Sequence, residues 1–122
     1  MKIQGKIKSD IGFYIGDPVY AFSEENYDDL WGGVGFAYGV HDAGDLKWAV
    51  ASIGDGDGRY YDNEGREYPV DSGTIALIPV EFVSQSDGGY IFNYPGKAEF
   101  LWEDGVFTIT LPTGKIIEIK NN

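Results

Sequence analysis

The chain has 122 residues, enough for one domain with its own core, and we expect a single domain over residues 1–122. It contains no cysteine, which excludes disulfides and thiolate zinc sites. Its 9 basic and 20 acidic residues give a formal net charge of −11, which opposes direct binding of nucleic acid because phosphate backbones carry the same sign.

The N-terminal stretch MKIQGKIKSDIGFYIG has lysine or glycine within every apolar run. It therefore fits neither a signal peptide nor a membrane span, and we expect a soluble, cytoplasmic protein without a membrane partner. The glycines form no phosphate-binding motif, because no Gly-Lys-Ser/Thr and no helix-opening Gly-x-Gly-x-x-Gly occurs. We expect no cofactor.

The first half of the chain predicts short strands and one helix. Alternation predicts strands over residues 2–8 (KIQGKIK), with a β-bulge at Gly5, and over residues 11–16 (IGFYIG). Ser23 can cap a helix over residues 24–31, which the two glycines at 32 and 33 would end. Residues 45–53 predict a half-buried strand, with Leu46, Trp48, Val50 and Ser52 on one face.

The second half predicts only strands and turns. A hairpin over residues 59–70 turns at Asp62 to Gly65, with positive φ at Gly65. Residues 74–83 are apolar on both faces, as in a central strand, until Pro79 interrupts the ladder. Further strands follow over residues 88–94 and in a three-stranded meander over 98–120. The fold class is therefore all-β, mainly antiparallel, as a sandwich or partly open barrel with one short helix.

The stretch VDSGT around Asp71 is spelled like the active-site loop of an aspartic protease. Such enzymes need two carboxylates that share a proton, so a single loop would have to act in a homodimer. It resembles the retroviral proteases over about six residues, but the apolar-apolar-Gly element that packs behind their loop is missing here. Asp-Ser-Gly-Thr is also a run of common turn formers, and we favour a turn between two strands over a catalytic Asp71.

The loop GDGDGRYYDNEG invites a calcium interpretation, because carboxylate oxygens suit Ca²⁺. The EF-hand template fails, since positions six and twelve counted from Asp55 are Tyr60 and Arg66. An irregular site could use Asp55, Asp57 and Asp62. We favour an acidic, glycine-rich loop that leads into a hairpin, without a metal.

Charge and aromatic residues suggest a binding surface. No base occurs between Lys8 and Lys47, whereas acids are frequent there: Asp10, Asp17, Glu24, Glu25, Asp28, Asp29, Asp42 and Asp45. Four aromatic residues lie within predicted strands and are expected in the core: Trp48, Phe100, Trp102 and Phe107. Five tyrosines flank turns and are candidates for the surface: Tyr60, Tyr61, Tyr68, Tyr90 and Tyr94. The binding residues we select are Tyr27, Asp28, Asp29, Trp31, Tyr60 and Tyr61.

The string IGDGDGRYYDNEGREYPVDSGTIALIP, with YIGDPVY and LWGG before it, resembles a group of small uncharacterised proteins of bacterial genomes and prophages. They carry Gly-Asp-Gly-x-Tyr, then Gly-x-x-Tyr-x-Val-Asp-Ser/Ala-Gly. The match covers about half of the chain. The resemblance implies no known activity; an alanine accepted where Ser72 stands would favour the turn over the protease.

These features together predict a small acidic protein without enzymatic activity that binds another protein. The partner is expected to be basic, as for an inhibitor, an immunity factor or an accessory subunit. The alternatives are a homodimeric aspartic-protease-like hydrolase that uses Asp71, and a module that binds calcium or carbohydrate.

Overall fold

The computed structural model describes residues 2–22, 39–43, 46–52, 58–71, 73–84 and 88–120, and these form two antiparallel sheets. The six-stranded sheet has the order β1 (Lys2–Ser9), β9 (Gly96–Glu103), β10 (Val106–Thr110), β11 (Ile116–Lys120), β5 (Gly58–Asp62) and β6 (Glu67–Val70). The five-stranded sheet has the order β3 (Gly39–Ala43), β4 (Leu46–Ser52), β7 (Thr74–Pro79), β2 (Phe13–Gly16) and β8 (Tyr90–Phe92). Two short 3₁₀ helices are η1 (Pro18–Tyr20) and η3 (Val80–Phe82).

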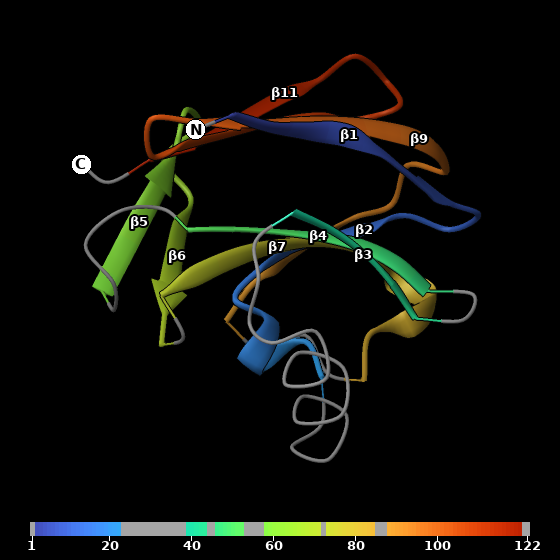
Figure 1. Cartoon of the computed structure of the whole chain (residues 1–122), viewed down its shortest axis with the longest axis horizontal. Coiled ribbons are helices and arrows are strands. Elements are labelled where there is room, and N and C mark those ends of the chain that lie inside the picture. The colour runs from blue at the N-terminus through green and yellow to red at the C-terminus, as the bar shows by residue number, and fades with distance from the viewer. Residues whose placement is uncertain are drawn as a thin grey trace.

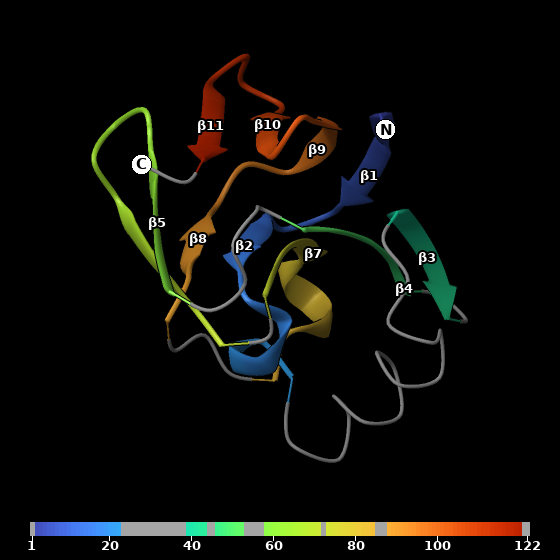
Figure 2. The same cartoon turned by 60° about the vertical axis from the view of Figure 1, so that its left-hand side comes forward.

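The two sheets lie in separate layers, with η1 on the far side of the five-stranded sheet (Figure 1). The chain crosses between the layers several times. Figure 2 shows one crossing, where β8 leads directly into β9. The expectation of an all-β, mainly antiparallel fold is therefore confirmed as a two-sheet arrangement.

The core lies between the sheets. It is a continuous cluster of side chains from both layers, among them Ile7, Phe13, Ile15, Tyr60, Tyr68, Leu77, Phe100, Phe107, Ile109 and Ile117. The expected core position of Phe100 and Phe107 is thus confirmed, and Trp102 packs against the same cluster while staying partly exposed.

A second apolar cluster covers the outer side of the five-stranded sheet. It contains Tyr14, Ala21, Phe22, Trp48, Val50, Ala76 and Ile78. The rings of Phe22 and Trp48 meet edge to face, with centroids 5.3 Å apart. β7 is consequently buried on both faces, as its sequence predicted, and it ends at Pro79. The half-buried strand expected over 45–53 is also buried on both faces at Trp48, Ala49 and Val50, because Phe22, after η1, belongs to the cluster on its outer side and Phe82 of η3 packs against that cluster.

The turns of the hairpins match their sequences. Gly65 has φ 85°, and its N–H donates to the Asp62 carbonyl over 3.2 Å. Asp104 and Gly105 both have positive φ, 53° and 79°, as a two-residue hairpin turn requires. The meander of β9, β10 and β11 is confirmed.

The bulge expected at Gly5 is wrong. The register between β1 and β9 runs without interruption from Lys2 opposite Glu103 to Ser9 opposite Gly96. Gly5 stands directly opposite Phe100. A glycine in a strand also marks a close approach of neighbouring groups, and here it leaves room beside a large ring.

The edge strands carry features that discourage pairing with other chains. β1 presents Lys2, Lys6 and Lys8 at one edge of the six-stranded sheet, and β6 contains Pro69 at the other. β8 has three residues.

The expected helix over 24–31 lies outside the described residues. Within the described ranges, no helix has the length and apolar character needed to cross a bilayer.

Two neighbouring isoleucines of β11 test the register. Ile117 is fully buried in the core, whereas Ile116 is 50% exposed on the opposite face. We predict that Ile117→Ala lowers the free energy of unfolding by about 2–5 kcal/mol, because it leaves a cavity between the sheets. Ile116→Ala should change it by less than about 1 kcal/mol. Urea unfolding of both variants checks this; equal losses would show that β11 does not have the described register.

Candidate functional site

Asp71 lies in the turn through which the chain passes from β6 to β7. Its N–H donates to Asp17 Oδ2 over 2.7 Å, and its Oδ2 accepts the hydroxyl hydrogen of Tyr20 over 2.7 Å. Gly73 has φ 75°, which only glycine adopts readily at such a corner. The backbone here is therefore the turn that we favoured from the sequence.

Asp17 is a partner that the sequence analysis did not single out. It caps η1: Pro18 occupies the first position, and Asp17 Oδ1 accepts the N–H of Val19 over 2.9 Å. The Asp17 side chain is buried, and each of its two oxygens accepts a backbone N–H. An aspartate directly before proline is a recognisable capping signal, so this position could have been found in YIGDPVY.

Asp17, Tyr20 and Asp71 together form what we call the η1 cluster. It joins two segments about fifty residues apart in the chain through short hydrogen bonds. Asp71 itself is exposed, and its carboxylate is held by a phenol rather than by a second carboxylate. The arrangement suits a turn anchor. The protease alternative would additionally require a second copy of the loop from another subunit.

Asp62, a candidate calcium ligand, is only 8% exposed and is held within the β5–β6 hairpin. Its Oδ1 accepts the N–H groups of Glu64 and Arg66, and its Oδ2 accepts hydrogens from the Tyr68 hydroxyl and Arg66 Nη1. These bonds occupy the carboxylate, so it does not point outward as a metal ligand would. Asp55 and Asp57 lie outside the described residues. In the part of the chain described, no three acidic or imidazole side chains gather as a metal site requires.

The contacts of Asp62 shift the ionisation of its neighbours as well. Burial opposes ionisation of the Asp62 carboxyl, but the hydrogen bonds from Arg66, Tyr68 and Glu64 outweigh burial and lower its pKa. Burial and the hydrogen bond to Asp62 raise the pKa of the Tyr68 phenol. The charged Asp62 carboxylate thus accepts hydrogen bonds from a neutral phenol and from a guanidinium. These charge-assisted bonds stabilise the hairpin.

Arg66 extends this network to the other sheet. Its guanidinium lies 5.1 Å from the centre of the Phe92 ring and 5.9 Å from that of Tyr90. Tyr90 also meets Tyr68 edge to face at 5.0 Å. The hairpin of the six-stranded sheet is therefore fastened to β8 of the five-stranded sheet.

The proposed aromatic anchors separate into different environments. Tyr60 is 2% exposed within the core, so the expectation that it lies at the surface is wrong, as it is for the fully buried Tyr68. In β5 the alternation turns Tyr60 inward and Tyr61 outward, and Tyr61 is partly exposed. Tyr94 is 37% exposed, as expected. The remaining selected residues, Tyr27, Asp28, Asp29 and Trp31, lie outside the described residues.

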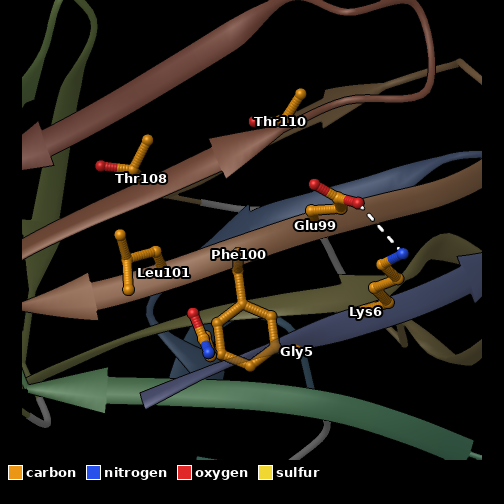
Figure 3. A pocket seen from close by; sticks show the side chains of 8 residues that line it. Gly5, Lys6, Glu99, Phe100, Leu101, Thr108 and Thr110 are labelled. Carbon is orange, nitrogen blue, oxygen red and sulfur yellow. Dashed lines mark ion pairs between the residues drawn. The ribbon is translucent and has the colours of Figure 1, made fainter. Parts of the chain in front are cut away.

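A concavity of about 590 Å³ opens on the outer face of the six-stranded sheet, between β1, β9 and β10. We call it the outer groove. Figure 3 shows Leu101, Thr108 and Thr110 along one side and the Lys6–Glu99 ion pair across it, with a nitrogen–oxygen distance of 3.2 Å. Phe100 points the other way from β9 and lies beside Gly5 (Figure 3). The groove offers hydroxyl groups and a small apolar surface.

On the outer face of β1 and β9, around the outer groove, lysines outnumber acids. β1 and β9 present Lys2, Lys6, Lys8 and Lys97 at the surface, against Glu99 and Glu103. The outward residues of β10 are uncharged: Val106, Thr108 and Thr110. In a chain with a net charge of −11, this face is therefore unusual.

We predict that Asp62→Asn destabilises the protein by about 3 kcal/mol at pH 7, because it removes the buried charge that Arg66 and Tyr68 bind and leaves Arg66 only its ion pair with Glu64. A carboxyl whose folded pKa is lowered stabilises the fold above its unfolded pKa, near 4, and loses this effect as pH falls through the folded value. The difference between wild type and variant should therefore shrink below about pH 4. Urea unfolding from pH 7 to 3 measures it, and Glu64→Gln, at the exposed end of the network, is the control. A difference that stays constant with pH would contradict the assignment.

The η1 cluster yields a second prediction. Asp71→Asn and Tyr20→Phe should each cost about 1 kcal/mol, and the double variant should cost less than their sum, because both remove the same hydrogen bond. Denaturant unfolding of the three variants measures this coupling. Additive costs would show that the bond contributes nothing.

The protease alternative has a separate test. If this protein cleaves an unfolded substrate protein at acid pH, and Asp71→Asn abolishes the cleavage, the protease alternative is established.

Searches of the chain against models of protein families, against curated proteins and against solved structures find no match. The resemblance based on the Gly-Asp-Gly-x-Tyr and Val-Asp-Ser/Ala-Gly motifs stays a prediction.

Proposed function

We propose that this chain is a non-enzymatic protein-binding module that binds a basic partner on the side of the fold that carries η1. We call this region the η1 side; it comprises η1, Ala21, Phe22, the Asp71 turn, Ser84 and Gly88. Within it, η1 lies on the far side of the five-stranded sheet from the six-stranded sheet (Figure 1), and hydrogen bonds join Asp71 to Tyr20 and Ser84 to Ala21. An inhibitor, an immunity factor or an accessory subunit would act in this way.

The observation that carries the proposal is the uneven placement of charge along the chain. All nine basic residues belong to the described part of the chain. Three of the stretches outside it contain seven acids and no base: Glu24, Glu25, Asp28 and Asp29 in 23–38, Asp55 and Asp57 in 53–57, and Asp87 in 85–87. The acid excess is therefore concentrated in these three stretches.

The described residues that flank these stretches meet at the η1 side. The stretch 23–38 follows Phe22, and the stretch 85–87 joins Ser84 to Gly88. Ser84 donates its N–H to the Ala21 carbonyl over 2.8 Å, and Gly88 packs so closely on the Tyr20 ring that an added Cβ would lie 2.7 Å from it. Both stretches are thus attached beside η1.

The stretch 53–57 is attached next to the same cluster. It joins Ser52 to Gly58; Ser52 stands opposite Thr74, and Gly58 stands opposite Val70. Val70 and Thr74 are the strand residues on either side of the Asp71 turn. The exposed carboxylate of Asp71 adds one more negative charge at this place.

The opposite face does not suit a basic partner. Lys6 lines the outer groove, and Lys2, Lys8 and Lys97 lie on the same outer face of β1 and β9. Like charges would oppose the approach of a basic protein there. The η1 side is therefore the better candidate for the binding surface. The selected residues Tyr27, Asp28, Asp29 and Trp31 belong to the stretch 23–38, which begins there.

Negative charge at the η1 side would act mainly on the rate of association. Electrostatic steering raises association rates by 10- to 1,000-fold at low ionic strength, and salt suppresses it. Aromatic residues beside the acids would supply the apolar contact that keeps the complex together.

We predict that the double variant Asp28→Lys, Asp29→Lys slows association with a basic partner by about tenfold at low salt. The partner is first captured from host lysate on the tagged wild-type protein at low and at moderate salt, and association rates are then measured at both. Glu103→Lys with Glu118→Lys makes the same change of charge on the six-stranded sheet and is the control; it should leave the rate within about twofold.

If no basic protein is retained at either salt, the proposed function is wrong. If a partner binds but both double variants slow it equally, the proposal of a specific binding side is wrong and only the total charge matters.

A further inference from the structure

Four lysines from three strands gather around a second hollow, of about 260 Å³. They are Lys6 and Lys8 of β1, Lys97 of β9 and Lys47 of β4, and Ile7 is the other residue that lines this hollow. We call them the lysine cluster. They are distant in the sequence, and the strand pairing brings them together at the end of the fold where β1 finishes and β4 begins.

Protection of a sheet edge accounts for only part of this cluster. Lysines on an edge strand discourage pairing with another chain, and β1 is such a strand. Lys97 and Lys47, however, belong to strands that have a partner on both sides. Their presence beside Lys8 needs a different reason.

The arrangement places like charges against each other. Lys8 and Lys97 stand directly opposite in the β1–β9 register, a pairing that destabilises a sheet when both residues are charged. Lys6 has a partner in Glu99, but no ion pair joins Lys8, Lys47 or Lys97 to any described residue. An anion in the hollow would relieve this repulsion.

Glu81 and Asp10 are the described acids next to the lysine cluster. They line an adjoining hollow with Lys8 and Lys47. The Glu81 carboxylate accepts hydrogens from the Ser9 hydroxyl and, over 3.0 Å, from the N–H of Asp10. It therefore holds the connection between β1 and β2. Asp42 stands opposite Lys47 in the β3–β4 register. Among the described residues, no acid lines the hollow itself.

We propose that the lysine cluster binds a small anion that carries a diphosphate group. Lysine binds phosphate as a point charge, and several ammonium groups around one hollow are best balanced by an anion with two or more charges. The hollow is slightly smaller than the usual range of ligand pockets, which favours a small ligand. A long polyanion is disfavoured by the net charge of −11 on the whole chain.

The experiment compares pyrophosphate with sodium chloride at equal ionic strength. Binding to the native state raises the melting temperature in proportion to the logarithm of ligand concentration, so pyrophosphate should raise it and sodium chloride should not do so equally. Titration calorimetry then gives the affinity for pyrophosphate. A nucleoside diphosphate in place of pyrophosphate distinguishes the two sources of the group: tighter binding indicates a nucleotide, and equal binding indicates free diphosphate.

Lys97→Gln and Lys47→Gln should each weaken pyrophosphate binding by about tenfold or more, since each removes one charged hydrogen-bond donor. Without pyrophosphate, Lys97→Gln should raise the melting temperature, because it ends the repulsion with Lys8. This second readout also shows that the variant is folded. Lys2→Gln is the matched control: it removes the same charge from β1, at a position opposite Glu103, and should leave the affinity unchanged.

Equal effects of pyrophosphate and sodium chloride on the wild type would overturn the proposal. So would a loss of affinity in Lys2→Gln as large as in Lys97→Gln, because binding would then follow total charge alone. Tighter binding of a short DNA duplex than of pyrophosphate would overturn it in favour of a nucleic-acid surface. None of these outcomes depends on a basic protein partner.

Discussion

The burial of β7 on both faces is the constraint from which the rest of the arrangement follows. Ile75 and Leu77 face the other sheet, whereas Ala76 and Ile78 face away from it into the second apolar cluster. A strand without a solvated face needs neighbours on both sides for its backbone groups and a cover over its outer face. β4 and β2 supply the neighbours, and Phe22 with the segments around η1 and η3 supplies the cover. The η1 side, where the acid-bearing stretches are attached, is thus the layer that covers the outer face of this sheet.

The parts of the fold that follow from local patterns were predictable. In the meander, inward and outward residues alternate strictly, and Asp104-Gly105 can adopt the positive φ values of its turn, so strands and register are specified within a short piece of chain. The environment of Tyr60 was not predictable in this way. It shares its face of β5 with Asp62, and an aspartate at that position indicates a solvated face. The hydrogen bonds that Arg66, Tyr68 and Glu64 donate offset the cost of burying the Asp62 carboxylate. These bonds form only in the folded hairpin.

Composition likewise reports the sum of the charges but not their arrangement. Nine bases spread over 122 residues suggest no basic surface, and lysines at positions 6, 47 and 97 share no local motif. The β1–β9 pairing and the packing of β1 near β4 bring them together. The capping aspartate at position 17 is the converse case, because its signal, an aspartate directly before a proline, is local and present in the sequence itself.

The fold keeps the two proposed binding regions apart. Lys47 and Ser52 occupy opposite ends of β4, one in the lysine cluster and the other beside the Asp71 turn. At about 3.3 Å per residue this strand separates them by about 16 Å. Charges in water are screened over about 8 Å at physiological ionic strength, so an anion on one region would hardly alter the attraction of a basic protein to the other. Near 0.01 M salt the screening length grows to about 30 Å, and the two regions would then influence each other. The independence of the two sites is therefore a property of the ionic strength as much as of the fold.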